Sequence, residues 1–238
     1  MTALRRRLPL GERVRGVELL DAGLLSDREL RTNLSDLARL NRLPGGTGRS
    51  IAAIRQLLSP GDSARILDVG TGAGDMPQAF ARLGWTVVAI DANPEVSAVA
   101  RERLAGLAAV EVREADGTRL PFDDGAVEVA HCSLLLHHLD PDSATALLRE
   151  MRRVATHGVV INDMRRGLLP LAATALSVTA LGRCRATRHD GVLSARRAYT
   201  PAELDSLLAA ADLRRIWRSP SIWPRVVTAA VDSRWGAR

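Results

Sequence analysis

The sequence predicts a single α/β domain whose core is a mostly parallel sheet of seven strands with helices on both faces. From Ala64 onward, short apolar runs typical of strands alternate with amphipathic segments that are long enough to be crossover helices. A chain of 238 residues can bury one sizeable core but is short for two full domains. We therefore expect residues 1–50 to form an N-terminal helical extension and residues 51–238 to form the main domain, with a helical cap inserted at about residues 165–200.

The extension carries leucines at helical spacing over residues 17–42. Ser26 and Glu29 form a capping-box pattern, and Asn33 or Ser35 is a candidate cap for a second helix. The segment LPGGTGRS, residues 43–50, then breaks the pattern. A further helix is expected over IAAIRQLL, which follows directly and ends at SPGD.

The strands of the main domain are expected where β-branched and apolar residues cluster. The candidates are residues 65–69, 86–91, 110–115, 127–133 and 158–163, with two more in RIWRSP and RVVTAAV near the end of the chain. The segments MPQAFARLG, PEVSAVARERLAGLA and PDSATALLREMRRVA lie between the earlier strands and predict crossover helices. Ligands of such sheets bind beyond the carboxyl ends of the strands, which is where the motifs below lie.

Three glycines at every second position follow the first strand: Gly70, Gly72 and Gly74. Glycine permits positive φ and lets a ligand lie directly on the main chain, and the N–H groups of the next helix face the same ligand. The GxxxxGK[ST] pattern of a phosphate-binding loop is absent, and GGTGRS at residues 45–50 lacks both its lysine and a preceding strand. Asp68, just before the glycines, would repel a pyrophosphate. A positively charged ligand without phosphate fits better, and S-adenosylmethionine (SAM) has a sulfonium and an amino group.

Acids at the next two strand ends support a nucleoside. Asp91 ends the second strand, where a carboxylate can accept hydrogen bonds from both ribose hydroxyls. Asp116 follows the third strand and is placed to accept a hydrogen bond from an adenine amine, while Gly117 permits close approach. Two carboxylates at consecutive strand ends are consistent with a nucleoside that lacks phosphate.

The motifs ILDVGTGAGD, VVAIDAN, ADGTRLPF and VAHCSLLLHHL, in this order, resemble those of class I SAM-dependent methyltransferases. They are most similar to the small-molecule branch that includes ubiquinone/menaquinone-biosynthesis methyltransferases, and the resemblance covers roughly residues 45–165. It implies a Rossmann-like fold and SAM as the cofactor. The chain departs from the family before the fifth strand, where Thr156, His157 and Gly158 replace a common Pro-Gly-Gly turn.

The resemblance also implies roles for individual residues at the cofactor site. The methionine part would be held by Asp68 and the three glycines, the ribose by Asp91 with Ala92 beside it, and the adenine by Asp116 and Gly117. Cys132 and Ser133, after the fourth strand, would lie against the cofactor.

Candidate catalytic residues follow the fourth and fifth strands. His137 and His138 lie just beyond the fourth strand, and Asp163 ends the fifth. Adjacent strand ends can bring a histidine and a carboxylate together, so that the acid orients the imidazole as a base. Some natural-product O-methyltransferases of this branch use such a His–Asp pair. The alternative is that the two histidines only pack, and we expect at most one of them to point into the site.

Residues 165–200 interrupt the alternation of strands and helices with an apolar helical stretch. As a cap over the pocket, this segment would give an apolar wall, with His189 and Tyr199 as the main polar contacts to substrate and Asp190 and Arg196 as further ones. The alternatives are a helix that packs on the protein's own core or a contact within a homodimer. The apolar stretch over residues 168–181 is too short to span a bilayer of about 30 Å, so no stable membrane insertion is expected.

The charge and cysteine content exclude several partners. The net charge of +6 comes from 33 basic residues, all of them arginine, against 27 acids, and the arginines are scattered beside acids. With only 3% aromatic residues, the sequence does not predict a nucleic-acid surface. Cys132 and Cys184 lack metal-ligand spacing, so no metal site is expected from the cysteines, and reduced thiols fit a cytoplasmic location. The first residues have no apolar signal-peptide core.

The sequence therefore predicts a SAM-dependent methyltransferase that acts on a small aromatic, quinone-like or polyketide acceptor. O-methylation is favoured over C-methylation, and the competing hypotheses are a catalytically inactive SAM-binding protein and an RNA methyltransferase. NLSDLARLNRLPGG and TRHDGVLSARRAYTPAEL are also similar to segments of methyltransferases that accompany bacterial type III polyketide synthases.

Overall fold

A computed structural model of the chain describes residues 12–220 and 224–234. Its centre is a seven-stranded sheet with the strand order β3-β2-β1-β4-β5-β7-β6. Strands β1 to β5 pair in parallel, whereas β7 is antiparallel to both of its neighbours. The predicted seven-stranded, mostly parallel sheet is confirmed. The strands are β1 Arg65–Val69, β2 Thr86–Asp91, β3 Val110–Glu114, β4 Val127–Ser133, β5 Ala155–Met164, β6 Leu213–Arg218 and β7 Arg225–Asp232.

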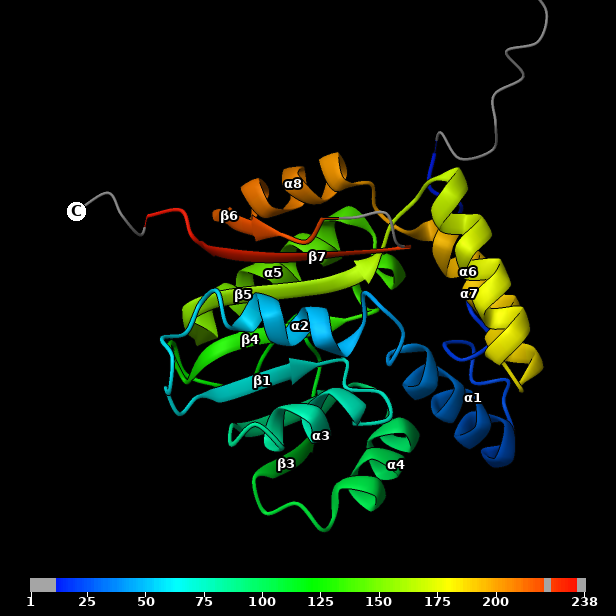
Figure 1. Ribbon diagram of the computed structural model, residues 1–238, viewed down its shortest axis with the longest axis horizontal. Coiled ribbons are helices and arrows are strands. Elements are labelled where there is room, and N and C mark those ends of the chain that lie inside the picture. The colour runs from blue at the N-terminus through cyan, green and yellow to red at the C-terminus, as the bar shows by residue number, and fades with distance from the viewer. Residues whose placement is uncertain (1–11, 221–223, 235–238) are drawn as a thin grey trace, which may run out of the picture.

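The helices cover both faces of the sheet and one of its ends (Figure 1). Helices α5 and α8 pack on one face, and α2 and α3 pack on the other. Their side chains, with those of the strands, form two clusters of buried apolar residues, as expected for strands that are buried on both faces. The helices are α1 Asp27–Leu40, α2 Thr47–Ile54, α3 Asp75–Ala81, α4 Pro94–Leu104, α5 Pro141–Val154, α6 Leu168–Leu181, α7 Arg185–Arg197 and α8 Pro201–Ala210, with a 3₁₀ turn η1 at Leu136–His138.

Helix α1 begins where the sequence predicts it. The Ser26 side chain accepts a hydrogen bond from the Glu29 backbone, and the Glu29 side chain accepts from the Ser26 backbone, which completes the capping box. The predicted second helix start at Asn33 or Ser35 is wrong, because both residues lie inside this one helix. The Asn33 amide donates to the Thr187 hydroxyl in α7 at 3.1 Å and so serves as a tertiary contact rather than a cap.

Several predicted boundaries differ from the observed elements, notably those of α2 and β5. Helix α2 starts at Thr47 and crosses the expected domain boundary at residue 50, because its buried face packs on the sheet as part of the main domain. Thr156, His157 and Gly158 are already part of β5, so no turn precedes this strand at the place where the family has one. Residues 1–11 of the predicted N-terminal extension lie outside the described residues.

The cap consists of α6 and α7, which lie with α1 beyond the carboxyl ends of the parallel strands (Figure 1). Asp36, fully buried in α1, accepts hydrogen bonds from the backbone of Arg183 and Cys184 and from the Thr187 hydroxyl at 2.6 to 2.9 Å. One carboxylate thereby joins the extension to the cap. Within the described part of the chain, no helix is both long and apolar enough to cross a bilayer.

Candidate active site

A cavity of about 520 Å3 opens at the carboxyl edge of the sheet. Its walls come from the loops after β1, β2, β3 and β4 and from helices α1, α6 and α7. This volume lies in the range of cavities that bury a small organic ligand or cofactor. Of the predicted cofactor residues, the cavity is lined by Asp68, Gly70, Gly72, Asp91, Ala92, Asp116, Gly117 and Ser133.

Asp68 forms part of the cavity wall, and its carboxylate is held in place by hydrogen bonds to neighbouring side chains. Its carboxylate accepts a hydrogen bond from the Thr71 hydroxyl at 2.7 Å and lies 2.6 Å from Nδ1 of His131. Nε2 of His131 lies 2.9 Å from the Ser50 hydroxyl, which also accepts from the Asn162 amide at 2.9 Å. All five side chains are buried, so the network fixes the orientation of Asp68.

Sequence reasoning missed His131, Ser50 and Asn162, the three residues behind Asp68. They come from β4, α2 and β5, which are far apart along the chain. A histidine in the middle of a strand pattern carries no local signal of this contact.

The glycine turn after β1 has two different functions. Gly70 and Gly72, with φ of +70° and +55°, expose the main chain to the cavity, and the Gly72 N–H donates to Asp91 at 3.0 Å. Gly74, also predicted to contact the cofactor, does not line the cavity. A Cβ at Gly74 would lie 2.6 Å from Cδ1 of Leu104, and its φ of +76° is in the left-handed region that favours glycine.

Asp91 lies at the end of β2 with both carboxylate oxygens fixed. One oxygen accepts from the Gly72 N–H and the other from the Asn93 N–H at 3.1 Å. Burial raises the pKa of Asp91, although these two hydrogen bonds act in the opposite direction. Since each oxygen has a second lone pair, the carboxylate can still accept from two hydroxyls of a ligand.

Asp116 and Gly117 lie on the cavity wall after β3. Asp116 is oriented by hydrogen bonds from the backbone and the hydroxyl of Thr118, both at 2.8 Å. A Cβ at Gly117 would lie 2.7 Å from a methyl group of Val69 and 2.9 Å from one of Leu147. The glycine therefore lets this loop approach the centre of the sheet.

The two residues at the end of β4 point in opposite directions. The Ser133 hydroxyl is buried at the cavity wall and has no hydrogen-bond partner among the described residues. Cys132, also predicted to lie against the cofactor, is only 1% exposed and belongs to the core rather than to the cavity wall. Successive side chains of a strand face opposite sides of the sheet, and burial raises the pKa of the Cys132 thiol well above its ordinary value.

His137 and Asp163 form the predicted pair. Nδ1 of His137 lies 2.6 Å from one carboxylate oxygen of Asp163, and the His137 backbone N–H donates to the other oxygen at 3.0 Å. Burial alone would raise the pKa of Asp163, but the charge of His137 and hydrogen bonds from His137 and Met164 lower it overall. Since a carboxylate can only accept, the proton of the neutral imidazole lies on Nδ1 and the lone pair on Nε2.

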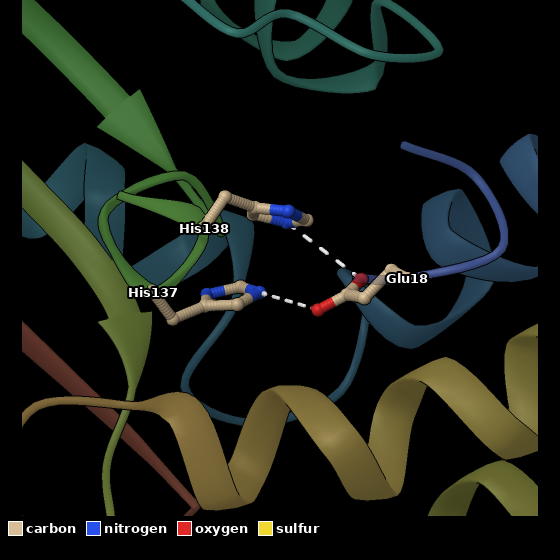
Figure 2. Close-up of side chains that lie close together, drawn as sticks. All are labelled: Glu18, His137 and His138. Atoms are coloured by element: carbon tan, nitrogen blue, oxygen red, sulfur yellow. Dashed lines mark ion pairs between the residues drawn. The ribbon is translucent and has the colours of Figure 1, made fainter. Parts of the chain in front are cut away.

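Both histidines face the cavity, which corrects the expectation that at most one of them would (Figure 2). They lie in the short 3₁₀ turn η1 rather than in a regular strand or helix, and their ring centroids are 4.3 Å apart. Both rings turn Nε2 toward Glu18, at 3.7 Å for His137 and 3.8 Å for His138. We call these three residues the histidine cluster.

Glu18 had no signal in the sequence, because it lies in an irregular segment before α1. The Ser194 hydroxyl donates to its Oε1 at 2.8 Å, and Arg197 lies 3.5 Å from the same oxygen. The segment is also fixed by Asp190, which accepts from the backbone of Leu19 and Leu20. The cap therefore positions Glu18 over the histidines.

The two residues predicted to contact substrate do not line the cavity. The Tyr199 hydroxyl donates to the Leu139 carbonyl at 2.9 Å and accepts from Arg13 at 2.7 Å, so it stabilises the loop after η1. The His189 side chain is 55% exposed, and its Nδ1 lies 2.8 Å from the Asp190 carboxylate. Of the polar residues predicted in the cap, Asp190 lines the cavity.

Comparison with known proteins shows what the chain is similar to. Residues 66–158 match the family model described as a methyltransferase domain. The chain is 35% identical over 122 residues to a demethylmenaquinone methyltransferase of Clavibacter sepedonicus, covering 50% of this chain and 49% of that protein. It is 31% identical over 157 residues to a ubiquinone biosynthesis O-methyltransferase of Xanthomonas oryzae pv. oryzae, covering 63% of each. The matches thus span about half to two thirds of these relatives.

The fold has solved counterparts as well. A SAM-dependent methyltransferase from Aquifex aeolicus superposes with a TM-score of 0.62 at 20% identity, covering 87% of this chain and 98% of that one. At this level of identity the likeness concerns the fold. The resemblance indicated by the sequence motifs is confirmed: residues 66–158 match a methyltransferase domain, and the chain has the Rossmann-like fold seen in a SAM-dependent methyltransferase.

Proposed function

We propose that the protein is a SAM-dependent methyltransferase that methylates a hydroxyl group of a small, mainly apolar acceptor. The observation that carries this proposal is a cavity that joins two sets of groups. On one side lie the acids and bare main chain after β1, β2 and β3, and on the other lies the His137–Asp163 pair after β4 and β5. A cofactor and an acceptor can therefore meet within one enclosure.

The residues on the cofactor side fit SAM. Asp68 suits a positively charged methionine part, Asp91 has free lone pairs for ribose hydroxyls, and the unpartnered Ser133 hydroxyl offers one more polar contact. When bound, SAM supplies an electrophilic methyl group on a positively charged sulfur. The protein holds that methyl group in position relative to the acceptor. Orientation alone can lower an activation barrier by about 7–11 kcal/mol.

The acceptor side is mostly apolar. Its wall includes Leu20, Leu34, Leu37, Leu134 and Val178, which come from the extension, the cap and the loop after β4. Such a wall suits an aromatic, quinone-like or polyketide acceptor and excludes water from the reacting groups. The names of the two curated relatives point to quinone-like molecules for those proteins, which supports the same class here.

The proton of the acceptor hydroxyl is taken up by His137. Asp163 holds Nδ1, so the lone pair lies on Nε2, which is turned toward Glu18 at the cavity wall, and the Asp163 carboxylate stabilises the imidazolium that forms. A base in such a position typically adds about 10²–10⁴-fold to a rate. Positioning contributes more than the base, and the base favours transfer to oxygen over transfer to carbon.

The test combines binding and product analysis. The binding of SAM and S-adenosylhomocysteine is measured by isothermal titration, and transfer is measured with methyl-labelled SAM against a panel of phenols, quinols and aromatic polyketides. We expect binding of both cofactor forms and an O-methylated product, identified by NMR, from at least one member. Tight SAM binding without transfer to any member would favour an inactive SAM-binding protein, and a C-methylated product would overturn the assignment to oxygen.

A further inference from the structure

The histidine cluster of Glu18, His137 and His138 places three metal-ligand atoms around one point (Figure 2). The ligand atoms all lie within 4.8 Å of one another. The separations of 3.7 and 3.8 Å between Glu18 and the two Nε2 atoms are too long for hydrogen bonds. Across the described residues, neither Nε2 atom takes part in a hydrogen bond. Two lone pairs and a carboxylate thus face one another at a distance that an ion could fill.

The rings are oriented as in metal sites. Nδ1 of His137 is held by Asp163 at 2.6 Å, and Nδ1 of His138 is held by Asp21 at 2.7 Å. Histidines that bind a metal usually donate their other ring N–H to a carboxylate, which fixes the tautomer and the ring orientation. Here both histidines have this partner, and both turn the remaining nitrogen toward Glu18.

The local charge favours a cation. Glu18, Asp21 and Asp163 bring three negative charges. Two arginines oppose them: Arg197 forms ion pairs with Glu18 and Asp21, and the charge of Arg225 acts on Asp163. With neutral histidines, one negative charge remains in excess (3 − 2 = 1), and a bound cation offsets the cost of burying it.

We infer that the histidine cluster binds one divalent metal ion such as Zn²⁺ through Glu18 and Nε2 of both histidines. A metal ion has bonds of about 2.0–2.2 Å to nitrogen and oxygen ligands. To bind one, the Glu18 oxygens and the two Nε2 atoms need to move only slightly closer together than the 3.7 and 3.8 Å observed. Two histidines and one carboxylate leave coordination positions open toward the cavity, and imidazole ligands favour zinc, cobalt or iron over magnesium or calcium.

Metal binding has two consequences. Glu18 belongs to the segment before α1 whereas the histidines follow β4, so the ion would join the extension to the main domain and raise the thermal stability. The second consequence rests on the proposed function. The lone pair on Nε2 of His137 cannot hold an ion and take a proton at the same time, so His137 acts as the proposed base only in the metal-free protein, and a bound ion inhibits methyl transfer.

The test measures metal binding directly on the full chain. Protein stripped with a chelator is titrated with Co²⁺, whose visible absorption reports histidine and carboxylate coordination, and Zn²⁺ is then added to displace it. We expect one equivalent of Co²⁺ to bind and a rise in the unfolding temperature with Zn²⁺. Asp21→Asn should weaken binding about 10–100-fold, as is typical for the partner of a ligating histidine. Glu18→Gln and His138→Gln should weaken it at least as much.

The matched control is His157→Gln, because His157 lies at the start of β5, at the opposite edge of the sheet. This variant should bind Co²⁺ like the unchanged protein. Binding of S-adenosylhomocysteine to every variant shows that the fold is intact and separates a failed metal site from a failed cofactor site. Absence of a one-equivalent Co²⁺ band, or equal binding in the Glu18→Gln and His138→Gln variants, would overturn the inference.

Discussion

The carboxylate of Asp163 holds His137 through two separate N–H groups, the backbone N–H at 3.0 Å and Nδ1 at 2.6 Å. Both residues are nearly inaccessible to solvent, so the orientation of the imidazole is fixed by one neighbour in the adjacent strand. Asp163 is thus a positioning residue for the proposed base.

Asp163→Asn should lower kcat by about 10²-fold or more, because an amide can stabilise the wrong tautomer of His137 and cannot stabilise an imidazolium. The affinity for S-adenosylhomocysteine, measured by isothermal titration, should stay the same. Full turnover in this variant would exclude the pair from the proton transfer.

His137→Gln and His138→Gln should differ in their effect on methyl transfer. Nδ1 of His137 is held by the buried Asp163, whereas that of His138 is held by Asp21, whose side chain is 37% exposed. We expect about 10²–10⁴-fold lower kcat for His137→Gln and a clearly smaller loss for His138→Gln. Equal losses, measured on metal-free protein, would contradict the assignment of the base to His137.

Asp91→Ala should weaken the binding of SAM by 10-fold or more, which corresponds to about 1.4 kcal/mol. The reason is that the variant loses the carboxylate that accepts from the ribose hydroxyls and from the backbone N–H of Gly72. Glu95→Ala, in the first turn of α4 and exposed, is the matched control. Unchanged affinity in Asp91→Ala would remove the ribose assignment.

The pH dependence of SAM binding should report the ionisation of Asp91. Burial raises its pKa above the ordinary value of 3.8, so the carboxylate takes up a proton at a higher pH than an exposed aspartate does. Affinity should be constant well above this raised pKa and fall as the pH drops through it. Asp91→Asn should bind more weakly and without this step, and an identical pH profile in the two proteins would contradict the account of this residue.

Asp36→Ala should destabilise the protein by about 3 kcal/mol or more, because it leaves three donors of the cap without their acceptor. The control is Asp27→Ala in the same helix, whose side chain is 78% exposed and pairs with Arg31 at the surface. That change should cost no more than about 1 kcal/mol. Denaturant unfolding measures the free energy of unfolding of both variants. Equal losses of stability in Asp36→Ala and Asp27→Ala would show that Asp36 does not secure the cap.

The main domain could be predicted from the sequence because its signals are local. The apolar run RILDV and the glycines after it define a buried strand and its turn, and Asp91 ends the next strand. The carboxyl ends of parallel strands meet at one edge, so motifs that are distant in the chain were expected at one site. The pairing of His137 with Asp163 follows from the same rule and is found in the structure.

The rest of the site depends on contacts that no local pattern encodes. Glu18 reaches the histidines only because the irregular segment before α1 is anchored to α7, and His131 bonds Asp68 across two strands. Their place in the cap predicts Tyr199 and His189 as substrate contacts. The orientation of α7 instead directs Asp190 toward the cavity, and Tyr199 lies beyond the end of this helix. Alternation along β4 similarly decides that Ser133, and not Cys132, reaches the cavity.

A crystal structure of the protein with S-adenosylhomocysteine tests the central claim most directly. We expect the nucleoside inside the cavity, with its ribose hydroxyls bonded to Asp91 and its sulfur facing the side of the cavity that holds His137. A cavity closed by side chains, or a di- or triphosphate bound there in preference to S-adenosylhomocysteine, would contradict the claim.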